Sequence, residues 1–126
     1  MDKVTGERVV ILGASNNPTR FSNKALKMLK NFGHLPLPVH PQLSQIEGEK
    51  VFSTLNEISG QVDTLTMYVG PKISSAMKED ILKLKARRVI FNPGSENPEL
   101  EKALRDEAGA EVVEACTLVM LQSGQF

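Results

Sequence analysis

The junction between a buried apolar run and a loop of small residues constrains this chain most. Residues 9–12 (Val-Val-Ile-Leu) show no alternation of polar and apolar positions, which is typical of a strand buried on both faces of a parallel sheet. Gly13, Ala14 and Ser15 follow, and a helical pattern begins near Ser22. Small residues let backbone N–H groups approach a ligand, and the N-terminus of the following helix favours negative charge. The junction fits a phosphate-binding loop and an ordinary tight turn equally well.

Strand and helix patterns alternate along the rest of the chain. We expect strands at 9–12, 35–39, 64–69, 88–91 and 111–115. We expect helices at about 22–32, 54–59, 71–86 and 98–108, and a final turn or short helix at 116–121. Strands separated by helices imply right-handed crossovers, hence an open α/β parallel sheet of about five strands with helices on both faces.

Local signals predict how several of these elements begin and end. Ser22 is expected to cap the first helix, with a hydrophobic staple between Phe21 and Leu26 and with Phe32 in its buried stripe. In the 71–86 helix, the inward residues are expected to be Ile73, Met77, Ile81 and Leu84. Asn97 and Gly109 are expected to cap the 98–108 helix.

Two prolines place the second strand at or near a sheet edge. Pro36 and Pro38 remove backbone donors from the same side of that strand, so only its other side can pair fully. A short neighbour at 51–52 is expected on the proline side. Residues 41–50 are expected to form a surface loop with a turn at Glu47 and Gly48.

Length and composition exclude several classes of protein. The chain has 126 residues, enough for one domain, and carries 15 basic and 15 acidic residues. A balanced charge gives no general attraction to nucleic acid or to an acidic membrane. No signal peptide or membrane span is recognisable, so we expect a soluble cytoplasmic domain. Cys116 is the only cysteine and His34 and His40 the only histidines, which argues against an internal disulfide and a zinc site.

The loop at 13–20 departs from the dinucleotide-binding motif G-x-G-x-x-G. Its three glycine positions hold Gly13, Ser15 and Pro18, and His40 and Pro41 follow the second strand where an acidic residue would hold a ribose. Arg20 can instead reach a pyrophosphate with charge-assisted hydrogen bonds, although a solvated surface arginine is the ordinary alternative. Ligands in such sheets bind at the carboxyl ends of the strands, where the strand order reverses.

Short motifs occur in order along nearly the whole chain. They are Val-Ile-Leu-Gly-Ala-Ser at 10–15, Pro18, Arg20, Ser22, Pro-Val-His-Pro at 38–41, Gly48, Val62, Asp63, Gly94, Val112, Val113 and Cys116. Their order and spacing resemble the small stand-alone CoA-binding proteins, which are related in fold to the N-terminal CoA-binding domain of the succinyl-CoA synthetase α subunit.

The resemblance implies a Rossmann-like domain that holds coenzyme A or an acyl-CoA at the switch point of the sheet. It places the pyrophosphate on Gly13, Ala14, Ser15 and Arg20, and the adenosine against Val39-His40-Pro41 and residues 68–72. The expected cofactor-binding residues are Gly13, Ala14, Ser15, Asn16, Arg20, Ser22, Val39, His40, Pro41, Tyr68, Val69, Gly70, Pro71, Lys72, Asn92 and Gly94.

The chain also departs from the family pattern. The family often has Phe-Arg-x-Pro after the third strand, where this chain has Tyr-Val-Gly-Pro at 68–71. His40 replaces the asparagine of Val-Asn-Pro, and Asn92 stands where Gln-x-Gly is common. CoA carries a 3′-phosphate, so its adenosine end should favour a cation, for which Lys24 and Lys72 are candidates.

No catalytic constellation is recognisable. A reactive thiol needs a cation, a base or a helix N-terminus, and Cys116 is expected to be a buried structural cysteine. The resemblance therefore favours a non-catalytic CoA-binding module. The alternatives are an NAD(P)- or other nucleotide-using enzyme and a scaffold that has lost its ligand. The run Val-Met-Leu at 119–121 is expected to pack against the domain's own sheet, with a homodimer or partner face as the alternative.

Overall fold

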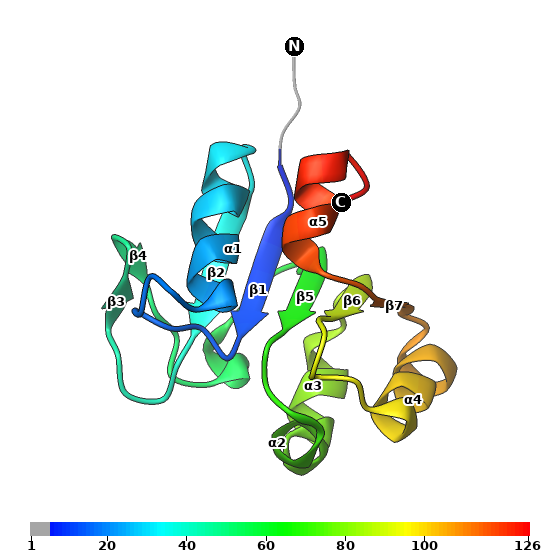
Figure 1. Cartoon of the computed structure of the whole chain (residues 1–126). Coiled ribbons are helices and arrows are strands. Elements are labelled where there is room, and N and C mark those ends of the chain that lie inside the picture. Colours follow the sequence, from blue (N-terminus) through cyan, green and yellow to red (C-terminus); the bar gives the residue numbers. More distant parts are fainter. Residues whose placement is uncertain (1–5) are drawn as a thin grey trace.

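A five-stranded parallel sheet forms the centre of the molecule, in the order β2-β1-β5-β6-β7 (Figure 1). This computed structural model describes residues 6–126. The expectation that the N-terminal segment is not a signal peptide concerns mainly residues 1–5, which lie outside the described residues. The strands are β1 (Arg8–Leu12), β2 (Leu35–Val39), β5 (Thr64–Met67), β6 (Arg88–Phe91) and β7 (Glu111–Glu114). Because β2 and β5 lie on opposite sides of β1, the strand order reverses there. The expected α/β parallel architecture is confirmed.

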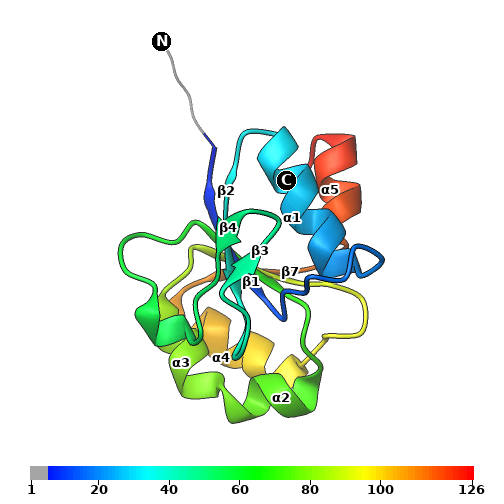
Figure 2. The same cartoon turned by 90° about the vertical axis from the view of Figure 1, so that its left-hand side faces the viewer.

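Helices cover both faces of the sheet (Figures 1 and 2). On one face lie α1 (Phe21–Asn31) and α5 (Thr117–Ser123). On the other lie η1 (Leu55–Glu57), α2 (Pro71–Ala76), α3 (Lys78–Leu84) and α4 (Pro98–Ala108). Alternate residues of β1 serve the two cores: Val9 and Ile11 pack with Leu26 and Leu121, and Val10 packs on the opposite side. This two-sided burial explains the unbroken apolar run.

The second strand lies at the edge of the sheet, as its prolines predict. β2 pairs with β1, and on its other side Val39 and Phe52 form one isolated parallel bridge. Residues 41–50 are not simply a surface loop, because β3 (Gln45–Ile46) and β4 (Glu49–Lys50) form a small hairpin that buries Ile46. The turn of this hairpin is at Glu47 and Gly48, both with positive φ.

The predicted start of the first helix was wrong. The helix begins at Phe21, and Arg20 occupies the N-cap position without a side-chain hydrogen bond. A backbone hydrogen bond from Arg20 N to Asn17 O (3.0 Å) turns the chain directly into the helix, so Ser22 lies within the first turn and is buried. Phe21 is 67% exposed and forms no staple, and Phe32 is 53% exposed rather than part of the buried stripe.

The expected single helix at 71–86 is two helices that meet at Met77. Met77 has φ −103° and ψ 12°, which ends α2 before α3 begins. Ser74 is fully buried and receives a hydrogen bond from the Asn97 side chain (2.9 Å), so Ser74 faces inward where Ile73 was expected. Ile73 is 53% exposed, whereas Ile81 is buried as predicted.

The last two helices match their sequence signals. The Asn97 side chain accepts a hydrogen bond from Leu100 N (3.2 Å), and Gly109 closes α4 with φ +65°. The expected final turn or short helix is α5, which packs Leu121 into the core and leaves Val119 exposed. None of the helices in the described part of the chain has the length and apolar character needed to cross a bilayer.

Candidate functional site

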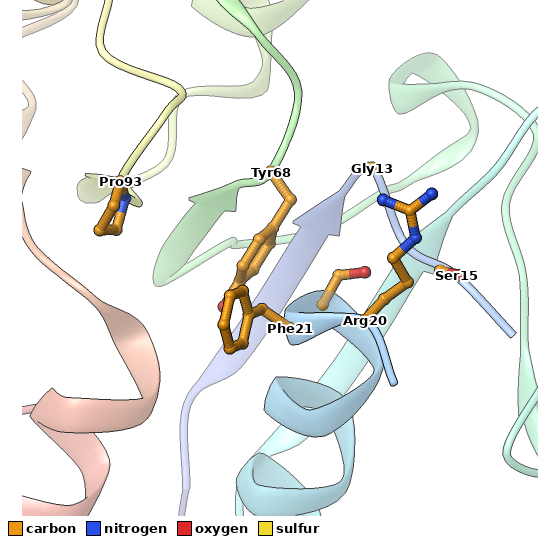
Figure 3. A pocket seen from close by; sticks show the side chains of 7 residues that line it. Gly13, Ser15, Arg20, Phe21, Tyr68 and Pro93 are labelled. Atoms are coloured by element: carbon orange, nitrogen blue, oxygen red, sulfur yellow. The ribbon is translucent and has the colours of Figure 1, made fainter. Parts of the chain in front are cut away.

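A cavity of about 360 Å³ opens at the carboxyl end of β1, beside the point where the strand order reverses (Figure 3). Its lining residues are Gly13, Ser15, Arg20, Phe21, Ser22, Tyr68 and Pro93. Gly13 has φ +91°, and a Cβ there would lie 3.0 Å from the Tyr68 carbonyl carbon and from Val69 Cγ1. A glycine is therefore required for the chain to pass this closely over the end of β5.

The loop at 13–20 is held by its own hydrogen bonds. Ser15 Oγ accepts from Asn17 N (3.0 Å), and Asn17 Oδ1 accepts from Thr19 N (3.0 Å). Asn23 of α1 donates to Ser15 O (2.9 Å) and thereby ties the loop to the helix. Ala14 N donates to Val39 O at 3.3 Å, so this amide is used within the protein rather than facing the cavity.

Arg20 gives the cavity a positive charge. Its side chain is exposed and lies beside Gly13 in Figure 3, and its guanidinium pairs with no carboxylate within residues 6–126. Arg20 also stands at the N-terminus of α1, whose first turn contains no acidic residue. The partial positive charge of the helix end adds to that of the guanidinium, so this side of the cavity favours an anion.

The residues after β2 do not line this cavity. Val39 is buried in the core and Pro41 is exposed. His40 Nδ1 accepts hydrogen bonds from Gln42 N (3.0 Å) and Leu43 N (3.1 Å). An asparagine side chain stabilises a turn in the same way, which explains how histidine can occupy this position. Lys24 lies elsewhere, 5.7 Å from the Phe21 ring centre and in the groove between α1 and α5.

The segment after β5 contributes one side chain to the cavity. Tyr68 lines it, whereas Val69 packs against the core beneath. Gly70 is the N-cap of α2, Pro71 is its first residue, and Lys72 is exposed. These three residues and Asn16 do not line the cavity, so the structure does not gather all of the expected site residues in one place.

Asn92 has a structural role at the end of β6. Its Nδ2 donates to Thr66 Oγ1 (2.8 Å) and to Met67 O (2.9 Å), and its Oδ1 accepts from Thr117 N (2.8 Å). These bonds leave its amide no free hydrogen for a ligand. Gly94 is exposed, and its N–H donates to Glu96 Oε1 (2.8 Å).

A second, more apolar cavity of about 310 Å³ adjoins the first. Its lining residues are Phe21, Tyr68, Asn92, Pro93 and Cys116. It shares Phe21, Tyr68 and Pro93 with the first cavity, so the two form a continuous hollow at the carboxyl ends of β1, β5 and β6. Phe21 was not among the expected lining residues, although it directly follows Arg20, which was.

Tyr68 lines both cavities. Its hydroxyl is buried near the Thr66 and Thr117 hydroxyls, but within residues 6–126 no group meets it at hydrogen-bond geometry. Burial raises the pKa of Tyr68 to about 12, and the nearby Thr117 and Thr66 hydroxyls offset only part of this effect. Tyr68 is therefore neutral at physiological pH and able to donate a hydrogen bond.

Cys116 is the one thiol on these walls, and it is partly exposed rather than buried. Neither His34 nor His40 lines either cavity. Within residues 6–126 no group of three or more His, Cys, Asp and Glu side chains is placed to hold a metal ion. The arrangement is suited to binding an anionic ligand with an apolar end.

Comparisons with known proteins identify the family of this chain. A family model described as a CoA binding domain matches residues 7–122. A crystal structure of an uncharacterised protein superposes with a TM-score of 0.89 at 41% identity, covering 98% of this chain and 100% of that chain. The Bacillus subtilis protein YneT, also uncharacterised, is 25% identical over 113 residues, which cover 90% of this chain and 84% of YneT.

One larger relative carries the same kind of domain. The α subunit of an ADP-forming acetate–CoA ligase of Pyrococcus furiosus is 34% identical over 65 residues, which are 51% of this chain and 14% of that subunit. The match is thus to a small part of the larger protein. Taken with the family match over nearly the whole chain, these findings show that the chain belongs to the CoA-binding domain family.

Proposed function

We propose that this protein binds coenzyme A or an acyl-CoA without catalysing a reaction, and that the loop at 13–20 holds the pyrophosphate. The observation that carries the proposal is the Arg20 guanidinium at the N-terminus of α1, which lies on the wall of a cavity at the switch point and pairs with no carboxylate of residues 6–126. The family match supports CoA as the ligand.

The contacts suggest how the pyrophosphate is held. Arg20 supplies the charge, and the Ser15 and Ser22 hydroxyls lie on the same wall. Ala14 N is bonded to Val39 O, so its role is to fix the loop against β2. Since a charge-assisted hydrogen bond contributes about 1.5–3 kcal/mol, substitution of Arg20 should reduce the free energy of CoA binding more than substitution of either serine.

The non-catalytic role rests on the side chains around the hollow. A thiol nucleophile needs a base or a cation to form the thiolate, and neither histidine lines the cavities that Cys116 adjoins. An enzyme using NAD remains the competing proposal, although His40 stands where that class needs an acidic residue.

The experiment is thermal unfolding and calorimetric titration with CoA, acetyl-CoA, NAD, NADP and ATP. A ligand at about 100 times its Kd should stabilise the protein by about 2.7 kcal/mol. We expect this with CoA or its thioester only. Arg20→Ala should weaken binding by about 1.5–3 kcal/mol, roughly 10- to 150-fold in Kd.

Arg105→Ala is the matched control, because Arg105 is an exposed arginine of α4 that lines neither cavity. It should leave CoA binding unchanged. Equal affinity in the Arg20 variant would contradict the pyrophosphate site. Stabilisation by NAD or NADP alone would favour the enzyme, and stabilisation by none of the five would favour a scaffold without a ligand.

A further inference from the structure

The second cavity has the character of a pocket for an acyl group. It adjoins the anion-binding cavity through Phe21, Tyr68 and Pro93, so a ligand with phosphates in the first can extend into the second. Phe21 and Pro93 line it with apolar surface. An apolar pocket with few polar groups is typical of sites that bury the uncharged end of a ligand.

The polar groups around this pocket are almost all used within the protein. The Asn92 amide is bonded to Thr66, Met67 and Thr117, and the hydroxyls of Thr66 and Thr117 are 2.8 Å apart and bonded to each other. The Tyr68 hydroxyl differs, because it is buried near these two threonines and yet makes no hydrogen bond of normal geometry to any group of residues 6–126. A phenylalanine would fill the same space without this cost, so the hydroxyl calls for an explanation.

The chemistry of a neutral phenol selects its partner. A tyrosine is protonated at physiological pH, and burial raises the pKa of Tyr68 further, so its hydroxyl is available as a hydrogen-bond donor. The complementary group is a carbonyl oxygen. A thioester presents a carbonyl oxygen next to an apolar chain, whereas the free thiol of CoA presents neither.

Phe21 lines the second cavity together with Tyr68. In the view of Figure 3, the Phe21 ring lies over the hydroxyl end of Tyr68. Phe21 is 67% exposed, so its ring can rotate without emptying the core. Movement of this single ring would let a ligand reach the phenol.

From these contacts we propose that the second cavity holds the thioester end of a short-chain acyl-CoA, with the Tyr68 hydroxyl donating to the thioester carbonyl. The protein then prefers acyl-CoA to free CoA. This inference rests on the proposed CoA binding and adds the ligand class and the residue that selects it.

The test compares three ligands by calorimetry: CoA, acetyl-CoA and S-ethyl-CoA, which keeps the two-carbon chain but has no carbonyl. The native protein should bind acetyl-CoA about 3- to 10-fold more tightly than S-ethyl-CoA, the range expected for one neutral hydrogen bond. Tyr68→Phe should bind acetyl-CoA and S-ethyl-CoA within twofold of each other. Thermal unfolding of the variant verifies that it is folded.

A second readout reports on Tyr68 directly. The chain has one tyrosine and no tryptophan, so all tyrosine fluorescence comes from this site. Acetyl-CoA should change that fluorescence more than S-ethyl-CoA does. Equal affinities for these two ligands in the native protein, or discrimination that survives in Tyr68→Phe, would overturn the acyl proposal while leaving CoA binding intact. Failure of all three ligands to bind would overturn the proposed function itself.

Discussion

Thr117 donates its backbone N–H to Asn92 Oδ1 at 2.8 Å, and this bond joins the end of β6 to the start of α5. The other end of the same amide donates to Thr66 Oγ1 and Met67 O of β5. One buried side chain thus holds together three elements beside the cavities. Its surroundings are fixed by folding and do not depend on a ligand.

Asn92→Ala should lower the free energy of unfolding by about 2–4 kcal/mol. The substitution removes three hydrogen bonds and leaves the buried N–H of Thr117 without a partner. Urea denaturation measures the change. Asn31→Ala, at an exposed position of α1, should change stability by less than about 0.5 kcal/mol. A similar small change at Asn92 would contradict the structural role given to it.

Gly13→Ala should destabilise the protein more than Gly94→Ala. Both glycines have nearly the same positive φ, +91° and +95°. An alanine at either position should therefore introduce a similar backbone strain of about 1–2 kcal/mol. Only at Gly13 does the added Cβ meet other atoms, at 3.0 Å from Tyr68 and Val69. The difference between the two unfolding free energies measures that steric conflict, and equal losses would show that the loop gives way without cost.

Asn23→Ala should weaken ligand binding indirectly, because Asn23 holds the loop at 13–20 and does not line the cavity. Asn23 is fully buried and donates to Ser15 O (2.9 Å) and to Glu47 Oε2 (3.1 Å), so it links the loop at 13–20 to the β3–β4 hairpin. Loss of this link should cost about 1–3 kcal/mol of stability and raise the Kd for CoA. A variant that loses stability but keeps the native Kd would show that the loop holds its shape by itself.

The sheet could be predicted from local patterns because each pattern had one physical cause. Two-sided burial made the β1 run continuous, and the missing donors of Pro36 and Pro38 put β2 at the edge. The caps of α4 depend on neighbouring residues only, so Asn97 and Gly109 were also correctly predicted.

The errors arise where distant contacts decide the outcome. Ile73 has the right spacing for a buried stripe, but the Asn97 side chain, more than twenty residues away, draws Ser74 inward instead. Phe21 was expected to form a hydrophobic staple because it directly precedes Ser22, the expected cap. The turn closed by the hydrogen bond between Arg20 N and Asn17 O instead starts the helix at Phe21. The unpartnered hydroxyl of Tyr68 has no sequence signal, because it depends on where the neighbouring threonines direct their own hydrogen bonds.

Tyr68 should ionise at a higher pH in the folded protein than in the unfolded chain, so raising the pH should destabilise the native protein. Burial raises the pKa of the folded protein's only tyrosine to about 12, while the unfolded chain has the ordinary value near 10. The folded state therefore keeps its proton in a range where the unfolded state releases it. Stability from this group is complete below pH 10 and is lost as the pH rises to about 12, by about 2 kcal/mol.

Two measurements check this titration. Phenolate absorbance should appear near pH 12 in the folded protein and near pH 10 in denaturant, with no tryptophan to obscure it. Urea denaturation across the same pH range should show this loss of unfolding free energy in the native protein and not in Tyr68→Phe. The comparison separates the effect of Tyr68 from that of the lysines, which titrate in a similar pH range. Bound acetyl-CoA should move the folded midpoint still higher, because a hydrogen bond donated to the thioester carbonyl favours the protonated phenol. An ordinary midpoint near pH 10 in the folded protein would place the Tyr68 hydroxyl in water and remove the basis for its part in ligand selection.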